Sequence, residues 1–449
     1  MGMQNPQEAI QSFSKAKVLV VGDIMLDRYT FGEVERVSPE APIPVVRKLS
    51  EASTLGGAAN VANNLATLGA KVWIAGVIGR DAAGATVKAL LDEKRIGTEA
   101  VLVSPDRPTT EKHRIVSGDS QQLVRLDTEG TNALAYKEEN ALYERIAPIV
   151  RASDAVIFSD YAKGSLSEAF AQKILNLARS AGKITLADFK PKNKAFFRGA
   201  DVISPNMKEA REMTGLDAVE EIGAALNKEF GAHVILTRGG EGMSVFRRED
   251  GSHHLVPGKK ITVFDVSGAG DTAIALLALG LSAGLDILGA AALANEGSAI
   301  VVQKPRTATL TQEELSAVLA GERHIDNVEI VPKIWGYEKW LENNDNYCCK
   351  ILSLNKGFQC SLHYHKNKDE TFLVTSGHVR LEAGGEISYL RAGSFVRIPP
   401  NTLHRFAGIQ DSIIVEVSTH HEESDSYRVE ESRKMDETPK TATQPRRER

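Results

Sequence analysis

Short apolar runs alternate with amphipathic stretches through the first two-thirds of the chain. The first run lies at residues 18–21 and ends in a Gly-Asp turn. Similar runs recur at 72–77, 155–158, 184–187 and 234–237, with helical patterns between several of them, as at 57–68 and 82–94. Alternating strands and helices predict a mostly parallel, doubly wound α/β sheet. Ligands of such sheets bind beyond the carboxyl ends of the strands. We therefore expect one shared rim for the residues that lie just past these runs: Asp23, Asp160, Tyr161, Asp188, Arg238 and Gly239.

The pattern changes after residue 330. Short alternating segments are separated by turns at 343–345, 384–385 and 399–401, which predicts a small antiparallel barrel or jelly roll. The last residues are charged and nearly devoid of apolar side chains, so we expect a mobile tail. The predicted organisation is an N-terminal extension at 1–14, an α/β domain at 15–320, a linker at 321–330, an all-β domain at 331–421 and the tail at 422–449.

The stretch 265–271, Asp-Val-Ser-Gly-Ala-Gly-Asp, carries the clearest chemical signal. Gly268 and Gly270 leave room for backbone N–H groups to converge on an anion. The Ala- and Leu-rich run 272–279 predicts a helix whose N-terminus favours the same anion. Asp271 lies at the junction, where a carboxylate can accept a proton from an attacking hydroxyl. Two alternatives stay open: a plain turn before a core helix, and a dinucleotide site, which Gly268-x-Gly270-x-x-Ala273 loosely fits.

Two further motifs each allow two interpretations. The turn at 56–60, Gly-Gly-Ala-Ala-Asn, predicts either close helix–sheet packing or a backbone surface against a sugar, with Asn60 bonding its hydroxyls. Asn206 and Glu209 stand one helical turn apart and predict either a metal-bound water shell, as magnesium prefers, or an ordinary helix start. The sequence contains no G-x-x-x-x-G-K-[ST], which excludes a P-loop enzyme.

Composition narrows the class of protein. A formal net charge of −5 favours neither nucleic acid nor an anionic membrane as a partner. No apolar run is long enough to span a bilayer and the first residues lack the apolar core of a signal peptide, so we expect a cytoplasmic protein. Cys348, Cys349 and Cys360 form neither a disulfide framework nor a spaced zinc pattern, and we expect them to be small buried apolar residues.

Four residues of metal-ligand type lie close together in the all-β region. His363 and His365 are two apart on an expected strand, so both rings face the same side. Glu370 and His404 would complete a set of three histidines and one carboxylate. Such a set suits a divalent transition metal with one or two positions left for water or a ligand. The competing interpretation is a group of ordinary surface or core histidines.

The turns at 56–60 and 265–271 resemble the two signatures of the ribokinase-like (PfkB) carbohydrate kinases, and the resemblance covers about residues 15–320. The stretches 20–29, 36–45 and 159–164 resemble the bacterial heptose 7-phosphate kinases. This resemblance implies ATP-dependent phosphorylation of D-glycero-D-manno-heptose 7-phosphate to the 1,7-bisphosphate, with Mg²⁺. The alternative is a kinase for another sugar, such as fructose 6-phosphate or an unphosphorylated sugar.

The same resemblance implies roles for individual residues. Asp271 would be the base, and Gly268, Ala269 and Gly270 would form the anion hole. The residues implied for ATP and Mg²⁺ are Asn206, Glu209, Thr237, Gly239, Gly242 and Asn295. Those implied for the sugar are Asp23, Gly56, Gly57 and Asn60.

A small β lid over the sugar is also implied, formed by residues 28–48 and 107–127. Such lids often pair, so we expect a homodimer through the lid. The candidates for binding a sugar phosphate are Arg28, Arg36, Lys112 and Arg114, although a single residue of this kind is more often a solvated lid charge.

Residues 331–420 resemble a cupin, although Asn401 and Gly408 depart from its second motif, where glycine and asparagine are usual. The stretch 332–338 resembles the entry to cupins of phosphosugar isomerases. The domain is therefore expected to be either a metal-dependent isomerase or a non-catalytic sugar-binding or regulatory module. The H-x-G-H turn of the nucleotidyltransferase that follows the kinase in bifunctional relatives does not occur here, so we expect no nucleotide-activated sugar from this chain.

Overall fold

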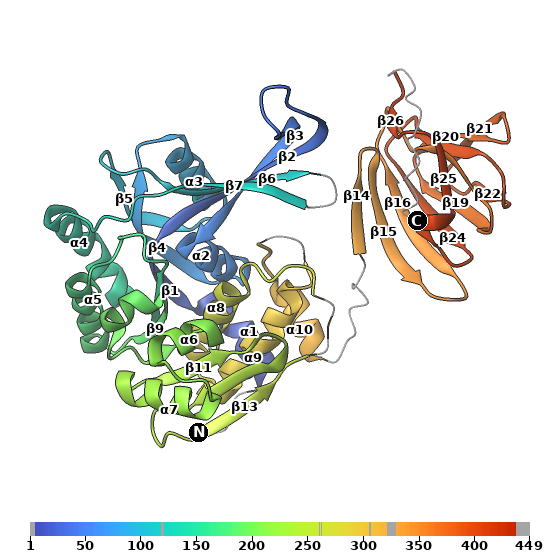
Figure 1. The fold of residues 1–449 in the computed structure, drawn as a ribbon. Coiled ribbons are helices and arrows are strands. Elements are labelled where there is room, and N and C mark those ends of the chain that lie inside the picture. Colours follow the sequence, from blue (N-terminus) through green and yellow to red (C-terminus); the bar gives the residue numbers. More distant parts are fainter. Residues whose placement is uncertain are drawn as a thin grey trace. The chain divides into compact units, whose positions relative to one another are not determined.

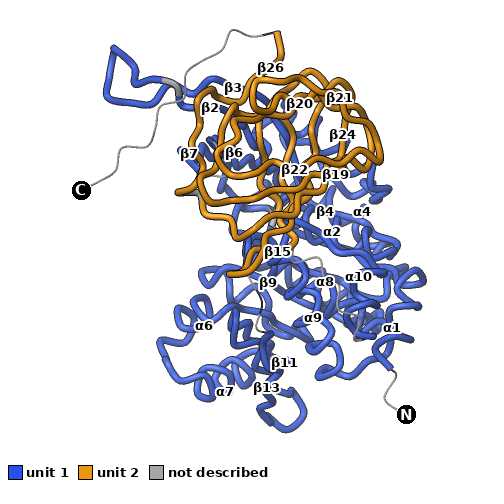
Figure 2. The backbone as a smooth tube through the Cα atoms, turned by 90° about the vertical axis from the view of Figure 1, so that its right-hand side faces the viewer, with its two compact units in different colours: residues 1–324 blue, residues 325–449 orange. Residues whose placement is uncertain are grey.

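The computed structural model describes residues 5–117, 121–259, 261, 263–304, 307–320 and 329–436. The chain divides into two compact units, Met1–His324 and Ile325–Arg449, which Figure 2 colours separately. Of the predicted linker at 321–330, only the last two residues fall within the described ranges.

A nine-stranded sheet forms the centre of the first unit. Its order is β13 (His253–Pro257), β12 (Gly242–Phe246), β11 (His233–Thr237), β10 (Val202–Ile203), β9 (Ile184–Phe189), β8 (Ala155–Asp160), β1 (Lys17–Gly22), β4 (Lys71–Gly79), β5 (Gly97–Ser104). All strands from β11 to β5 pair in parallel, and β12 and β13 add an antiparallel edge. The predicted doubly wound sheet is confirmed.

Helices cover both faces of this sheet (Figure 1). They are α1 (Pro6–Ser12), α2 (Ala58–Thr67), α3 (Ala82–Glu93), α4 (Tyr136–Ala152), α5 (Glu168–Ser180), α6 (Met207–Thr214), α7 (Val219–Phe230), α8 (Ala269–Ser282), α9 (Ile287–Val301) and α10 (Gln312–Leu319). Along β1, Val18 and Val20 join one hydrophobic cluster, and Leu19 and Val21 join the other. Successive side chains of a strand point to opposite faces, so a strand buried on both sides is apolar throughout, which is why the strands were visible in the sequence.

The N-terminal segment differs from the predicted extension at 1–14. Asn5 caps α1 by accepting a hydrogen bond from the Gln7 amide, and Pro6 occupies the first turn. Ile10 and Phe13 are fully buried in the cluster that contains α8 and α9. Two apolar residues three positions apart give this short polar segment one buried side, so its described part belongs to the core of the first unit.

A separate four-stranded sheet projects from the first unit (Figure 1). Its order is β3 (Pro44–Gly57), β2 (Ile24–Val37), β6 (Thr110–Ser117), β7 (Gln121–Thr128). Because β2 follows β1 after a single residue and β3 leads directly into α2, the lid is connected to the rim of the central sheet at both ends. The predicted β lid is confirmed, and residues 118–120 lie outside the described ranges.

The second unit is built from two antiparallel sheets. One has the order β14 (Glu329–Lys333), β15 (Gly336–Asn343), β16 (Cys348–Leu354), β24 (Ser412–Ser418), β19 (Glu370–Ser376), β22 (Phe395–Ile398). The other has the order β21 (Glu386–Arg391), β20 (His378–Ala383), β23 (His404–Gly408), β17 (Phe358–Gln359), β26 (Arg433–Lys434), with β18 (Leu362–His365) paired to β23 and β25 (Ser426–Glu430). Every second residue of β16 is buried, as expected for strands with one face on a core, and the all-β prediction is confirmed.

The segment after residue 421 differs from the mobile tail that its composition predicts. β25 pairs with β18, and β26 pairs with β17. The Tyr364 and Tyr427 rings stack with centroids 5.1 Å apart, and Arg405 forms an ion pair of 2.6 Å with Glu430. Backbone pairing and ion pairs order this polar strand with few apolar contacts. Residues 437–449 lie outside the described ranges.

Candidate active site and candidate metal centre

The turn at 265–271 forms the N-terminus of α8. Gly268 has a φ of 84°, in the region that favours glycine, and α8 begins at the next residue. A Cβ atom on Gly268 would lie 3.0 Å from Asn60 Nδ2, and a Cβ on Gly270 would lie 3.9 Å from Asp188 Oδ2. The first amides of the helix therefore lie at a close junction of three segments, where their partial positive charge favours an anion.

Asp271 is held from two sides in the first turn of α8. Asn60 Nδ2 donates to its Oδ2 over 2.6 Å, and the Tyr161 hydroxyl donates to its Oδ1 over 2.8 Å. The residue is 5 % exposed, and burial raises the pKa of its carboxyl group to about 6. Burial also raises the pKa of Tyr161 well above its ordinary value, so the phenol stays a donor. The result is a fixed carboxylate with a higher proton affinity than an exposed aspartate.

The turn at 56–60 supports this carboxylate through α2. Gly57 has a φ of 56°, and its Cβ would lie 2.5 Å from the Asp23 carbonyl oxygen, so the predicted close packing is present. Asn64 Nδ2 donates to the Asn60 carbonyl over 2.9 Å, and Thr272 Oγ1 donates to Asn64 Oδ1 over 2.8 Å. This buried polar chain fixes α2 against α8. The Asn60 amide thus faces Asp271, a contact that the sequence did not reveal.

Asp23 lies on the rim but holds backbone. Its Oδ2 accepts from the amides of Tyr161 and Lys163 over 2.8 and 2.9 Å, and its Oδ1 accepts from the Ser165 amide over 3.2 Å. The residue is 1 % exposed. Between two of these amides, Ala162 adopts a φ of 58°. Asp23 therefore shapes the loop after β8 and places Tyr161 beside Asp271.

A cavity of about 160 Å³ joins several of the predicted site residues. It is lined by Tyr161, Asp188, Lys190, Ser204, Asn206, Glu209, Thr237, Gly268, Gly270 and Asp271. Asp23, Gly56, Gly57, Asn60, Gly239, Gly242, Ala269 and Asn295 do not line it. The lining comes from the carboxyl ends of β8, β9, β10 and β11 together with the α8 turn, which is the edge that the sequence pattern indicated.

Asn206 and Glu209 form the helix start that one interpretation predicted. Asn206 Oδ1 accepts from the Glu209 amide over 2.9 Å, and Glu209 Oε2 accepts from the Asn206 amide over 3.1 Å. Glu209 Oε1 accepts from Lys190 Nζ over 2.6 Å. Both side chains nevertheless line the cavity. Burial, then Glu209 and Asp271, raise the pKa of Asp188 to about 7, so three carboxyl groups share this space.

The other implied nucleotide residues lie around the β12–β13 edge. A Cβ on Gly242 would lie 2.1 Å from the Val256 carbonyl, so close backbone approach explains that glycine. Asn295 Nδ2 donates to the Pro257 carbonyl over 3.0 Å. Gly239 has a φ of 58°, and within the described ranges no atom beyond its two chain neighbours lies within 4 Å of its Cβ position.

The lid carries several charged side chains near the site, and the sequence pointed to only some of them. Asp27, 7 % exposed, forms an ion pair of 2.6 Å with Arg114, and Arg28 pairs with Glu111 over 2.7 Å. Lys112 Nζ lies 5.2 Å from the centre of the Tyr161 ring. Asp27 was not among the predicted site residues, although its place on a strand that leaves the rim was a usable signal.

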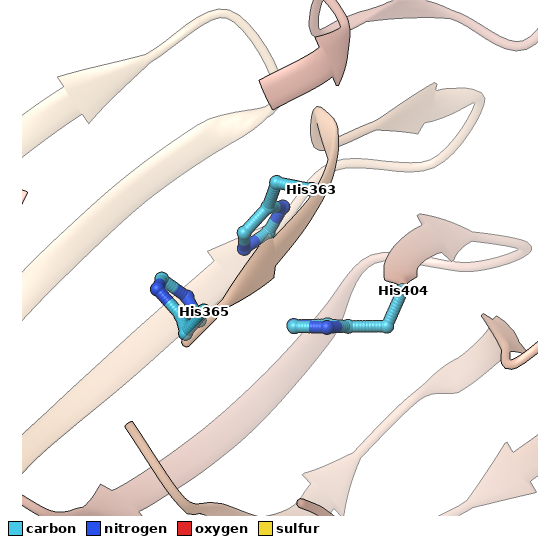
Figure 3. A group of neighbouring side chains, drawn as sticks. All are labelled: His363, His365 and His404. Atoms are coloured by element: carbon cyan, nitrogen blue, oxygen red, sulfur yellow. The ribbon is translucent and has the colours of Figure 1, made fainter. Parts of the chain in front are cut away.

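Three histidines meet inside the second unit (Figure 3). His363 and His365 come from β18 and His404 from the adjoining β23, with one ring nitrogen of each within 4.8 Å of the others. In each ring Nδ1 bonds a backbone carbonyl over 2.9 Å: Ser361 for His363, Asp425 for His365 and Thr402 for His404. With Nδ1–H as donor, each Nε2 carries a lone pair, the form that metals bind.

Glu370 completes the predicted set. Its Oε2 lies 3.2 Å from His404 Nε2, and its Oε1 lies 3.5 Å from His365 Nε2. With both nitrogens in acceptor form, these are contacts between electron-rich atoms, and the buried Oε2 has no donor among the described residues. Burial, then His404, lowers the pKa of His363 to about 3, which keeps that ring neutral. The donor set therefore fits a divalent transition metal.

The two departures from the cupin motif have physical reasons. Asn401 has a φ of 63°, a conformation that favours glycine and that asparagine tolerates. A Cβ on Gly408 would lie 2.5 Å from the Asn355 carbonyl, so a side chain there would collide with backbone.

Comparison with known proteins identifies both units. Residues 15–314 match the model of the pfkB family carbohydrate kinases. The chain belongs to this family. Residues 350–419 match the cupin domain. A bifunctional protein HldE from Desulfatibacillum aliphaticivorans is 38 % identical over 364 residues, covering 80 % of this chain and 74 % of the relative. That of Caulobacter vibrioides is 42 % identical over 318 residues, covering 68 % and 64 %.

Solved structures show the fold of the kinase. Ribokinase from Arabidopsis thaliana, complexed with ribose and ATP, superimposes with a TM-score of 0.55 at 19 % identity, covering 68 % of this chain and 98 % of that one. Phosphofructokinase-2 from Escherichia coli, in complex with substrates and products, gives 0.56 at 16 % identity, covering 68 % and 99 %. The ribokinase-like fold is thereby confirmed.

This PfkB kinase is a phosphotransferase with an alcohol group as acceptor, and a sugar is its substrate class. ATP is its phosphoryl donor. Among the described residues, no helix is long and apolar enough to cross a membrane.

The Asp271 carboxyl group predicts the pH dependence of turnover. If Asp271 is the base that the resemblance implies, it acts when deprotonated, so kcat should rise with pH through about 6 and level off above it. The Tyr161 hydrogen bond stabilises the carboxylate and lowers this pKa, so Tyr161→Phe should move the rise to higher pH. Steady-state pH profiles measure the shift. Tyr136→Phe, at an exposed tyrosine, is the matched control, and an unmoved profile in Tyr161→Phe contradicts the assignment.

Proposed function

We propose that the first unit transfers the γ-phosphoryl group of ATP to the anomeric hydroxyl of D-glycero-D-manno-heptose 7-phosphate. A bond forms between the sugar oxygen and the γ-phosphorus, the bond from that phosphorus to the β-phosphate oxygen breaks, and the hydroxyl proton passes to Asp271. The products are ADP and the 1,7-bisphosphate. Two observations support this substrate: the similarity to the HldE relatives, and the resemblance of the stretches 20–29, 36–45 and 159–164 to heptose 7-phosphate kinases.

The observation that carries the proposal is the placement of Asp271 in the first turn of α8. A buried base lies beside the amides that would hold the transferred group, so proton acceptance and charge stabilisation occur together. Lys190, which also lines the cavity, brings a positive charge to the same space. Such fixed electrostatics supply most of the catalysis of phosphoryl transfer.

The cavity also fits Mg²⁺. Asp188, Glu209 and Asp271 share one confined space, and their mutual repulsion contributes to the raised pKa of Asp188. Oxygen-rich acidic sites of this kind suit a hard divalent cation. Asp188 and Glu209 would hold the ion with ATP phosphates, where it neutralises phosphate charge. Thr237, which also lines the cavity, would lie on the nucleotide side, and Gly239, Gly242 and Asn295 would follow along the β12–β13 edge.

Lys112 is the lid residue best placed for the sugar phosphate. Arg28 is engaged by Glu111 and Glu51, and Arg114 by Asp27. Among the described residues, Lys112 has no ion-pair partner within 4.0 Å, and burial lowers the pKa of its ammonium group. A phosphate at this position would offset that burial, and Lys112 Nζ lies 5.2 Å from the centre of the Tyr161 ring, whose hydroxyl contacts Asp271.

Substitution of the base tests the kinase proposal. Asp271→Asn keeps the shape and removes the proton acceptor, so kcat with the heptose 7-phosphate should fall by about 10²–10⁴-fold while ATP binding persists. Steady-state kinetics and ATP titration measure the two effects. Asp286→Asn is the control, because Asp286 caps α9 and asparagine caps a helix equally well. Near-normal turnover in Asp271→Asn would remove Asp271 as the base.

We further propose that the second unit holds one divalent transition metal on His363, His365, His404 and Glu370. When bound, the ion supplies Lewis acidity, which suits either a phosphosugar isomerase or a non-catalytic sugar-binding module. Asp425 would position this site, because its carboxylate accepts from the amides of Lys366, Asn367 and Lys368 over 3.0 to 3.1 Å. Its carbonyl also accepts from His365 Nδ1.

Metal content tests this centre. The full chain should retain about one equivalent of metal after dialysis, and His363→Ala should lose it. Asp425→Ala should weaken metal binding by about 10–100-fold, as loss of a residue that orients a ligand does. Elemental analysis with chelator competition measures both. Asp345→Ala, on an exposed turn, is the control, and equal affinity in Asp425→Ala would show that the C-terminal segment does not support the site.

Pairing of two copies through the lid is also proposed. Its sheet exposes Val34, Leu49, Val124 and Leu126, each between 42 % and 54 % accessible. Exposed apolar side chains gathered on one sheet are typical of a protein–protein contact. Pairing of two copies would place these side chains in the interface between the two lids.

A further inference from the structure

The cavity of the second unit is far larger than a metal ion requires. Its volume is about 820 Å³, within the range of pockets that enclose small organic ligands. The histidine cluster lines it, and so do Trp340, Lys350 and His421, whose ring centre lies 6.4 Å from that of His365. A ligand of sugar size would therefore have a second set of partners beyond the metal.

A buried chain of alternating charges runs from the histidine cluster to that second set. Lys368 donates to Glu370 over 2.8 Å and to Glu416 over 2.5 Å, and Lys350 lies 3.9 Å from Glu416. All four side chains are at most 5 % exposed. Across the whole lining, four basic residues match four acidic residues. The lining is thus neutral before any metal binds, and a divalent ion on neutral histidines would leave two positive charges uncompensated.

The other end of this chain of charges carries two nitrogen donors of the cavity lining, Lys350 Nζ and Trp340 Nε1. Lys350 Nζ lies 3.7 Å from the centre of the Trp340 ring and 3.4 Å from His421 Nδ1. The Trp340 Nε1 atom is buried and has no hydrogen-bond partner among the described residues. A buried indole N–H is normally satisfied, so its place beside an ammonium group in the same cavity indicates an oxygen anion as a shared partner of the two.

We propose that this cavity binds a small hydroxylated organic anion. Its anionic group lies at Lys350 Nζ and Trp340 Nε1, and its hydroxyl or carbonyl oxygens reach the metal on the histidine cluster. The inference rests on the metal centre proposed above and names the class of ligand for it. A sugar phosphate and a sugar acid share this chemistry, and binding measurements separate them.

The test uses the full chain loaded with Zn²⁺, with metal per chain counted by elemental analysis. Calorimetric titrations without ATP compare glucose 6-phosphate, gluconate, glucose and inorganic phosphate as probes. At least one of the two hydroxylated anions should bind about 10-fold or more tightly than glucose and than inorganic phosphate. Glucose 6-phosphate as the tighter probe identifies a phosphate ester, and gluconate identifies a carboxylate.

Two variants assign the preference to the named donors. Lys350→Met should remove the advantage of the anion over glucose, and Trp340→Phe, which keeps an aromatic ring and loses the N–H, should reduce it several-fold. Lys356→Met, at an exposed lysine outside the cavity, is the control. Any binding at the kinase unit is common to all variants, so the differences report the cupin alone.

The outcomes separate this inference from the metal centre. A chain that binds no metal overturns the proposed centre. A chain with one metal that binds glucose as tightly as both anions, or whose preference survives Lys350→Met and Trp340→Phe, keeps the centre and overturns the anion site.

Discussion

The kinase unit depends on one buried contact, the hydrogen bond from Asn60 to Asp271 across 211 positions of sequence. It joins the first turn of α2 to the first turn of α8. The hydrogen bond from the Tyr161 hydroxyl to Asp271 connects the loop after β8 to the same carboxylate. A carboxyl group removed from water would otherwise keep its proton at neutral pH. The two donors lower the pKa against burial, so the group remains a usable base while burial holds it above the range of an exposed aspartate.

The same physical logic recurs in the cupin. There the side chains are imidazoles, and backbone carbonyls fix their orientation and tautomer. Asp425 does for the loop of His365 what Asp23 does for the loop of Tyr161: a buried carboxylate accepts several backbone amides and thereby places a neighbouring side chain. In both units the residue proposed to act differs from the residue that positions it, and only geometry distinguishes the two.

Much of the fold could be predicted from the sequence because strands buried on both faces are apolar throughout, as at β1 and β8. Gly268, Asp271 and the histidine spacing were visible for a similar reason, since their chemistry is local. Asp27 and the Asn60 contact depend on segments that meet only after folding. β25 was hidden because it pairs through backbone and charge, while composition reports only its lack of apolar residues. The packing of α1 against the core was not visible in the sequence, because two large apolar residues of this polar segment, Ile10 and Phe13, make the contact.

The proposed reaction at Asp271 is phosphorylation of the anomeric hydroxyl of a heptose 7-phosphate. Phosphorus NMR of the products, with the full chain, ATP, Mg²⁺ and this substrate beside fructose 6-phosphate, tests it most directly. We expect one new phosphate signal coupled to the anomeric proton of the heptose, in equal amount to ADP, and a much slower reaction of fructose 6-phosphate. No anomeric phosphate, or preferred phosphorylation of fructose 6-phosphate, would contradict it.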